Sequence, residues 1–155
     1  MQEKINFLKK DFHDLLLKLS AEDKGRWGLM NAQQMVEHMT DTFRIANGKE
    51  FQKIELDPER VIKVRSFFLS DKPFRENTSN HLLPAVPNPF RNGSMDDARD
   101  ELQRETNEFF ASFENNSERS TINPFAGSFK FEEWIQLLHK HATHHLIQFG
   151  LIESS

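Results

Sequence analysis

The C-terminal stretch after residue 128 constrains the fold of this chain more than any other segment. Its apolar side chains recur at steps of three and four residues, which predicts a helix with one face toward a core. The helix is expected to begin at residue 129 or 130 and to run to about 149. Two histidines, His141 and His145, interrupt this apolar stripe. Their four-residue spacing puts both imidazoles on one face of a helix, where they can share one metal ion.

Three earlier segments carry the same helical periodicity. Residues 3–20 place their apolar side chains on a single stripe. A second helix is predicted over 31–46, where Asn31 and Gln34 have the spacing of a capping box. A third is predicted over 94–115, with a serine cap and two aspartates in its first turn.

The connection between the second and third of these helices is irregular. Residues 49–94 hold five of the six prolines. A short helix over 58–69 is expected there, and a strand over 60–69 is the alternative because valine and isoleucine are frequent in strands. The stretch 82–90 is expected to be an extended loop, and 116–128 a polar loop. A long loop inside a compact domain commonly covers a functional site.

These elements predict an all-α fold, a four-helix bundle with one long crossover connection between helices 2 and 3. The 155 residues, 15 of them phenylalanine, suit one domain over 1–155 with one core. We see no internal repeat that would suggest a different architecture.

Composition excludes several classes of function. The net charge is −4 without a lysine or arginine block, so we expect no nucleic-acid surface. The absence of cysteine rules out disulfides, a cysteine nucleophile and thiolate metal ligands. The N-terminus lacks the basic-then-apolar order of a signal peptide, and no apolar run approaches the ~20 residues that span a membrane. We therefore expect no membrane partner and a cytoplasmic location.

His38 points to a third metal ligand. It falls three residues after Met35 and seven before Ile45, so it occupies the inward stripe of the second helix. Three unpaired imidazoles in a core would each cost roughly a few kcal/mol, and a shared cation removes that cost. We predict His38, His141 and His145 as metal ligands, with a position open for water or substrate. The alternative is a polar, histidine-rich helix without metal.

Two related metal patterns do not fit. A di-iron carboxylate bundle needs a glutamate three residues before each histidine, and this chain has Met35, Leu138 and Ala142 at those positions. A zinc metalloprotease needs a glutamate directly after the first histidine of the pair, where this chain has Ala142.

Other polar residues of the last helix lie close to the predicted ligands. His144 is rotated away from the inward stripe, so we expect it beside the metal ligands or at the surface. Gln148 lies two turns from His141 on the same face and could hydrogen-bond a ligand or bound water; an ordinary helix-end residue is the alternative. We expect surface, boundary or loop positions for the remaining histidines, His13, His81 and His139.

Several of these motifs resemble a known family. The run from His141 to Gln148 resembles the last-helix motif of the DinB/YfiT-like superfamily, in which two histidines four apart precede a glutamine. The run from Trp27 to Met39 resembles that superfamily's second-helix motif. Together with Asn123–Gly127 and Glu133–Trp134, these runs resemble a DUF1569-type branch of it.

This resemblance implies an up-down-down-up bundle with a divalent metal held by His38, His141 and His145. Characterised members include metal-dependent S-transferases and isomerases that use low-molecular-weight thiols. Members of the transferase type often have Arg-Gly after the last histidine, where this chain has Leu146 and Ile147.

Our leading hypothesis is a metal-dependent transferase that uses a small thiol activated on the three-histidine site. A hydrolase with a metal-bound water would use the same site. The alternatives are a non-catalytic metal- or ligand-binding bundle and a purely structural helical protein. Three histidines suit Zn, Ni, Co and Fe alike. The expected partners are a small-molecule thiol and an electrophilic substrate, and a homodimer is compatible with the sequence.

Overall fold

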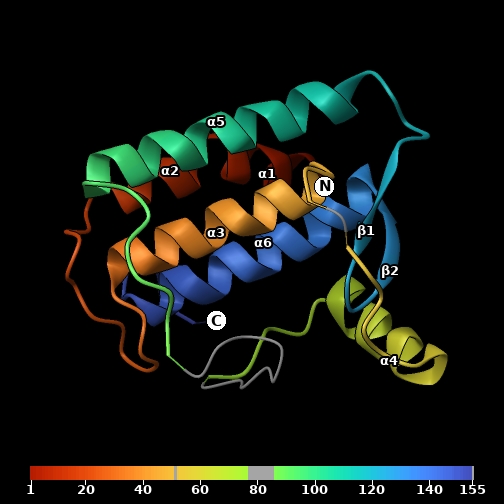
Figure 1. Ribbon diagram of the computed structural model, residues 1–155, viewed down its shortest axis with the longest axis horizontal. Coiled ribbons are helices and arrows are strands. Elements are labelled where there is room, and N and C mark those ends of the chain that lie inside the picture. The colour runs from red at the N-terminus through yellow and green to blue at the C-terminus, as the bar shows by residue number, and fades with distance from the viewer. Residues whose placement is uncertain (51, 77–85, 155) are drawn as a thin grey trace.

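The structure is a computed structural model that describes residues 1–50, 52–76 and 86–154. Helices make up most of the described chain, and its strands form one short two-stranded sheet (Figure 1). This content is compatible with the predicted all-α class.

The N-terminal helical stretch consists of α1 (Gln2–Asn6), a π-helical turn η1 (Phe7–Asp11) and α2 (Phe12–Leu16). The residues that join these pieces keep right-handed helical dihedral angles, so the stretch is one rod. The predicted helix over 3–20 is confirmed, although it ends earlier, at Leu16.

Helix α3 (Ala32–Ala46) begins with the predicted capping box. The Asn31 side chain accepts a 3.0 Å hydrogen bond from the Gln34 amide, and the Gln34 side chain accepts a 2.9 Å bond from the Asn31 amide. These bonds satisfy two amides that a helix start leaves unpaired. Helix α5 (Met95–Glu114) begins as predicted with Ser94 as its cap.

Helix α6 (Phe131–Gln148) is the predicted last helix, and α4 (Pro58–Leu69) confirms the short helix rather than the strand. Asp57 caps α4, and the proline lies in its first turn, where no amide hydrogen is needed. No residue of α4 is fully buried. Its apolar side chains therefore lie at the edge of the core.

The prediction of a polar loop over 116–128 is wrong from residue 120 onward, because a β-hairpin forms there. Strand β1 (Ser120–Asn123) pairs antiparallel with β2 (Gly127–Lys130). The Asn123 side chain accepts hydrogen bonds from the two amides of the turn, and Gly127 has a φ of +86°. Four-residue strands are too short to show a clear alternation, so the polar composition suggested a loop. The hairpin contacts α6 through a 2.7 Å bond from the Trp134 indole to Thr121.

The core lies between the N-terminal rod, α3, α5 and α6. Helix α3 packs against α5 and α6, and the rod packs against the same two helices (Figure 1). Aromatic rings fill much of this space; Phe43 of α3 meets Phe109 of α5 edge to face at 5.8 Å. This packing brings one face of α3 against one face of α6, which is what the predicted metal site requires.

Candidate metal centre

Three histidine side chains from two neighbouring helices converge on one point. His38 lies on α3, and His141 and His145 lie on α6. The Nε2 atom of His141 is 3.0 Å from Nε2 of His38 and 2.9 Å from Nε2 of His145. Among the described residues these three form the one group of histidines or carboxylates whose ligand atoms all lie within 4.8 Å of one another. The structure thus brings together the three residues predicted as ligands.

Gln148 fixes which nitrogen of His145 faces the other rings. Its Oε1 lies 2.7 Å from His145 Nδ1, and its Nε2 donates a 2.9 Å bond to the Trp27 carbonyl. Because the amide nitrogen is used by that carbonyl, Oε1 must accept, so Nδ1 of His145 carries the hydrogen. A neutral His145 then has its lone pair on Nε2, which points toward His38 and His141.

The three rings are held in their neutral form. Burial lowers the pKa of His38 from its ordinary value of 6.5 to about 4. Burial, and then the neighbouring imidazoles, lower the pKa of His141 and His145 well below 6.5. No proton therefore competes for these lone pairs near neutral pH, as metal coordination requires.

The donor set fits a divalent transition-metal ion. Metal–imidazole bonds of about 2.0–2.1 Å in a tetrahedral site put the ligand nitrogens about 3.3 Å apart. The Nε2–Nε2 separations from His141 to His38 and to His145 are a few tenths of an ångström shorter, so small side-chain rotations would admit an ion. Three neutral ligands leave the charge of the ion uncompensated and at least one coordination position free.

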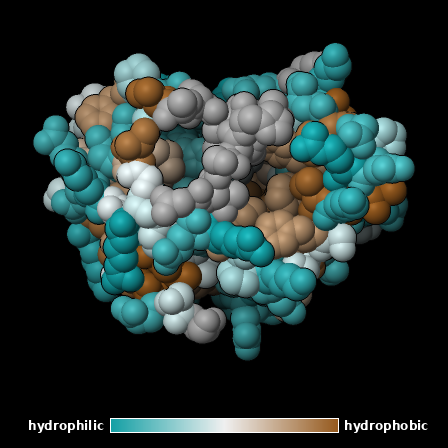
Figure 2. Space-filling model, turned by 90° about the horizontal axis from the view of Figure 1, so that it is seen from below, coloured by the Kyte–Doolittle hydropathy of each residue, from teal (hydrophilic) through white to brown (hydrophobic). Residues whose placement is uncertain are grey.

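The connection between α4 and α5 is attached to α6 near its start and to α3 near its end. Near its start, the Ser70 carbonyl accepts a 2.8 Å bond from Gln136 of α6, and the Phe74 ring lies 5.9 Å from the His141 ring. Near its end, the buried carboxylate of Glu37 on α3 accepts bonds of 2.8 Å from the amides of residues 91 and 92. Figure 2 shows the molecule from below the view of Figure 1, a face on which hydrophobic side chains are exposed among hydrophilic ones.

The sequence gives no signal for the contact of Phe74 with His141 or for the bonds of Glu37 to the backbone of residues 91 and 92. Phe74 follows a proline in an irregular segment, where no periodicity predicts its direction. Glu37 is a buried charged residue in the middle of α3. A glutamate directly before a predicted ligand gives no signal that it will bind backbone amides of a distant segment.

The other histidines occupy separate surroundings. His144 is half-buried between the rings of Trp27 and Phe74, with centroid separations of 5.6 Å to each, so it lies beside the ligands as predicted. His139 packs edge to face on Phe7 at the boundary of the protein, also as predicted. His13 is more buried than a surface position, and its Nε2 has no hydrogen-bond partner in the described chain. The predicted loop position of His81 lies outside the described residues.

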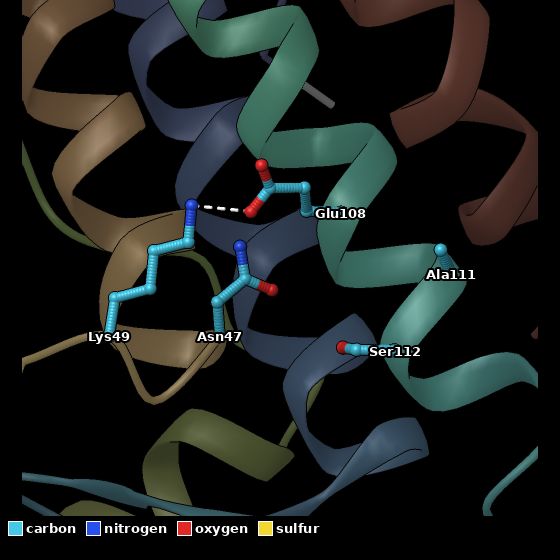
Figure 3. Close-up of a pocket in the computed structure, with 5 residues that line it drawn as sticks. All are labelled: Asn47, Lys49, Glu108, Ala111 and Ser112. Atoms are coloured by element: carbon cyan, nitrogen blue, oxygen red, sulfur yellow. Dashed lines mark ion pairs between the residues drawn. The ribbon is translucent and has the colours of Figure 1, made fainter.

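A cavity of about 390 Å³ lies elsewhere, between the end of α3 and α5. Asn47, Lys49, Glu108, Ala111 and Ser112 line it (Figure 3). Lys49 pairs there with Glu108 and, at 2.7 Å, with Glu105, so its charge is compensated. Of the described residues that line the cavity, Glu108 alone carries a carboxylate, and we assign no chemistry to it.

Comparisons with protein-family models, with curated proteins and with solved structures found no match to this chain. The resemblance to the DinB/YfiT-like superfamily therefore stays a prediction that depends on the motif residues. Within the described residues, no helix is long and apolar enough to cross a membrane.

Proposed function

We propose that His38, His141 and His145 hold a divalent metal ion, such as Zn, Ni, Co or Fe, in a catalytic centre. The observation that carries this proposal is the convergence of three Nε2 atoms from two helices, with their ligand atoms within 4.8 Å of one another. We further propose that the rod, α3, α5 and α6 form a four-helix bundle in up-down-down-up order, because each of these elements packs against two of the others.

The reaction that this site supports best is the transfer of a small thiol to an electrophile. A bound ion would supply a Lewis acid that lowers the pKa of a thiol in its open position. In the overall reaction the thiol releases its proton to solvent, its sulfur bonds to the electrophilic carbon, and a leaving group departs with the electron pair of the bond that breaks. The chain itself contributes the orientation of His145 through Gln148 and an apolar ring, Phe74, beside His141. It needs no nucleophile of its own, in keeping with the absence of cysteine.

A non-catalytic metal-binding bundle is the second candidate. One observation favours it: within the described chain, no carboxylate hydrogen-bonds to any of the three ligand histidines. Enzyme sites commonly hold a group that accepts the proton of the attacking water or thiol, and a site that only binds metal needs none.

Turnover measurements separate the two candidates. Metal-loaded protein is incubated with a panel of low-molecular-weight thiols and one generic electrophile, such as 1-chloro-2,4-dinitrobenzene, before and after treatment with a chelator. A transferase gives chelator-sensitive turnover with at least one thiol. Stoichiometric metal without turnover for any thiol would leave the binding function as the better account.

A further inference from the structure

We propose that the metal centre adjoins a subsite for a planar aromatic group, built from Trp27, Phe74 and His144. This inference rests on the proposed function, because it assigns the subsite to the electrophile that reacts at the metal centre. The subsite would select electrophiles that carry a planar aromatic group, a preference that the three metal ligands alone do not specify.

The three rings form a continuous surface that reaches a metal ligand. The His144 ring lies 5.6 Å from the Trp27 ring on one side and 5.6 Å from the Phe74 ring on the other. The Phe74 ring then lies 5.9 Å from the ring of His141. Phe67 of α4 extends the surface behind Phe74, at 5.4 Å. A ligand on this surface would therefore be next to the ion.

These aromatic residues lie at the edge of the core, against which Phe74 packs. Trp27, Phe74 and His144 are each partly exposed, whereas Phe43 and Phe109 are completely buried. The three come from separate parts of the chain: the connection before α3, the segment after α4, and α6. Small-molecule sites typically combine apolar and aromatic side chains with a few polar groups, as these rings and the neighbouring histidines do.

The chemistry of this surface favours a neutral aromatic ring over a charged group. Lys140 Nζ lies 5.9 Å from the centre of the Phe74 ring, but it is directed to the Phe67 carbonyl and to Ser70 Oγ at 3.3 Å, so it is not available to an anion. The Trp27 indole N–H has no hydrogen-bond partner within the described residues and could donate to an acceptor on the ring. Ring faces and edges bind other rings in offset or edge-to-face geometry, which a saturated ring cannot match.

Calorimetric binding of a matched pair of unreactive probes tests this subsite. The probes are 2-naphthylmethanol and its fully saturated decahydro counterpart, each titrated into metal-loaded and chelator-treated protein. We expect the naphthyl probe to bind at least about fivefold more tightly than the saturated one in both forms. Equal affinities for the two probes would overturn the proposal.

Substitutions locate the binding surface. Phe74→Leu and Trp27→Leu, made separately in case one variant folds poorly, should each weaken the naphthyl probe about fivefold. The control is Phe90→Leu, since Phe90 is a 44% exposed phenylalanine outside the subsite; it should leave affinity unchanged. Equal loss in the control, or no loss in either subsite variant, would contradict the assignment. Because the probes do not react, failure of the thiol chemistry alone would leave these results intact.

Discussion

Gln148 links the proposed metal centre to the connection that precedes α3. It is 4% exposed, and its amide bonds both His145 and the Trp27 carbonyl. The sequence left open whether this residue binds a ligand or only ends the helix. The structure favours a role at the site, because the Gln148 side chain orients His145, one of the three proposed metal ligands.

Replacing Gln148 by leucine should weaken metal binding about 10- to 100-fold, the usual effect of losing a residue that orients a histidine ligand. The cause is the loss of the acceptor that keeps the hydrogen of His145 on Nδ1. Competition with a chromophoric chelator measures the affinity.

Gln136→Leu is the matched control, because this glutamine lies on the same helix but bonds the Ser70 carbonyl. We expect it to lower stability while metal affinity stays within about twofold of the wild type. Equal loss of metal affinity in the two variants would mean that Gln148 acts through general stability.

His13 gives a pH dependence that is independent of the metal. Burial lowers its pKa from 6.5 to about 4, although Asp14 opposes the shift. The unfolded chain therefore binds more protons than the folded one between about pH 4 and 6.5, so stability falls as pH falls through this window. His13→Leu should remove about 1–2 kcal/mol of the stability lost between pH 7 and pH 5.

Urea unfolding of both proteins at pH 7 and pH 5 measures this difference. If the wild type and His13→Leu lose the same free energy of unfolding on acidification, the burial of the His13 ring is not the cause of the pH dependence.

At the scale of elements, the connection before α3 is shaped around Gln148. Gly28 has a φ of +81°, and a Cβ atom added there would lie 2.8 Å from Gln148 Nε2. Gly25 is similarly close, since its Cβ would lie 3.0 Å from Gln148 Cγ. These glycines let the backbone approach the side chain that orients His145.

Gly28→Ala should therefore reduce both stability and metal affinity. The left-handed backbone costs an alanine about 1–2 kcal/mol, and its methyl group would displace the Gln148 amide. Thermal unfolding and chelator competition measure the two effects.

Gly48→Ala is the control for Gly28→Ala, because Gly48 also has a positive φ, of +69°, but lies at the end of α3. It should reduce stability by a similar amount and leave metal affinity unchanged. A Gly28→Ala variant with wild-type metal affinity would contradict the proposed role of this connection.

The sequence predicted those helices and strands that carry a strong local pattern, such as a cap or a long apolar stripe. Helix α3 was predictable because Asn31 and Gln34 form a capping box, and α6 because a long apolar stripe precedes Gly150. The hairpin was not predictable, since its strands have four residues each and its turn depends on side-chain bonds from Asn123.

At the scale of the whole molecule, the site depends on how α3 and α6 face each other. The spacing of His141 and His145 showed that both lie on one helix face, and the stripe of α3 showed that His38 points inward. The contact between the two helices is a tertiary feature, which local periodicity cannot determine. Phe74 reaches His141 from the connection between α4 and α5, for which the sequence offers no geometric signal either.

The measurement that tests this account most directly is metal content and affinity in untagged protein. We expect about one divalent ion per chain in wild-type protein, and a reduction of at least about 100-fold in affinity for His38→Ala. His139→Ala, which removes a histidine of α6 that packs on Phe7, should retain the ion. Less than about 0.1 ion per chain after metal reconstitution, or equal affinity in the wild type and His38→Ala, would contradict the three-histidine centre.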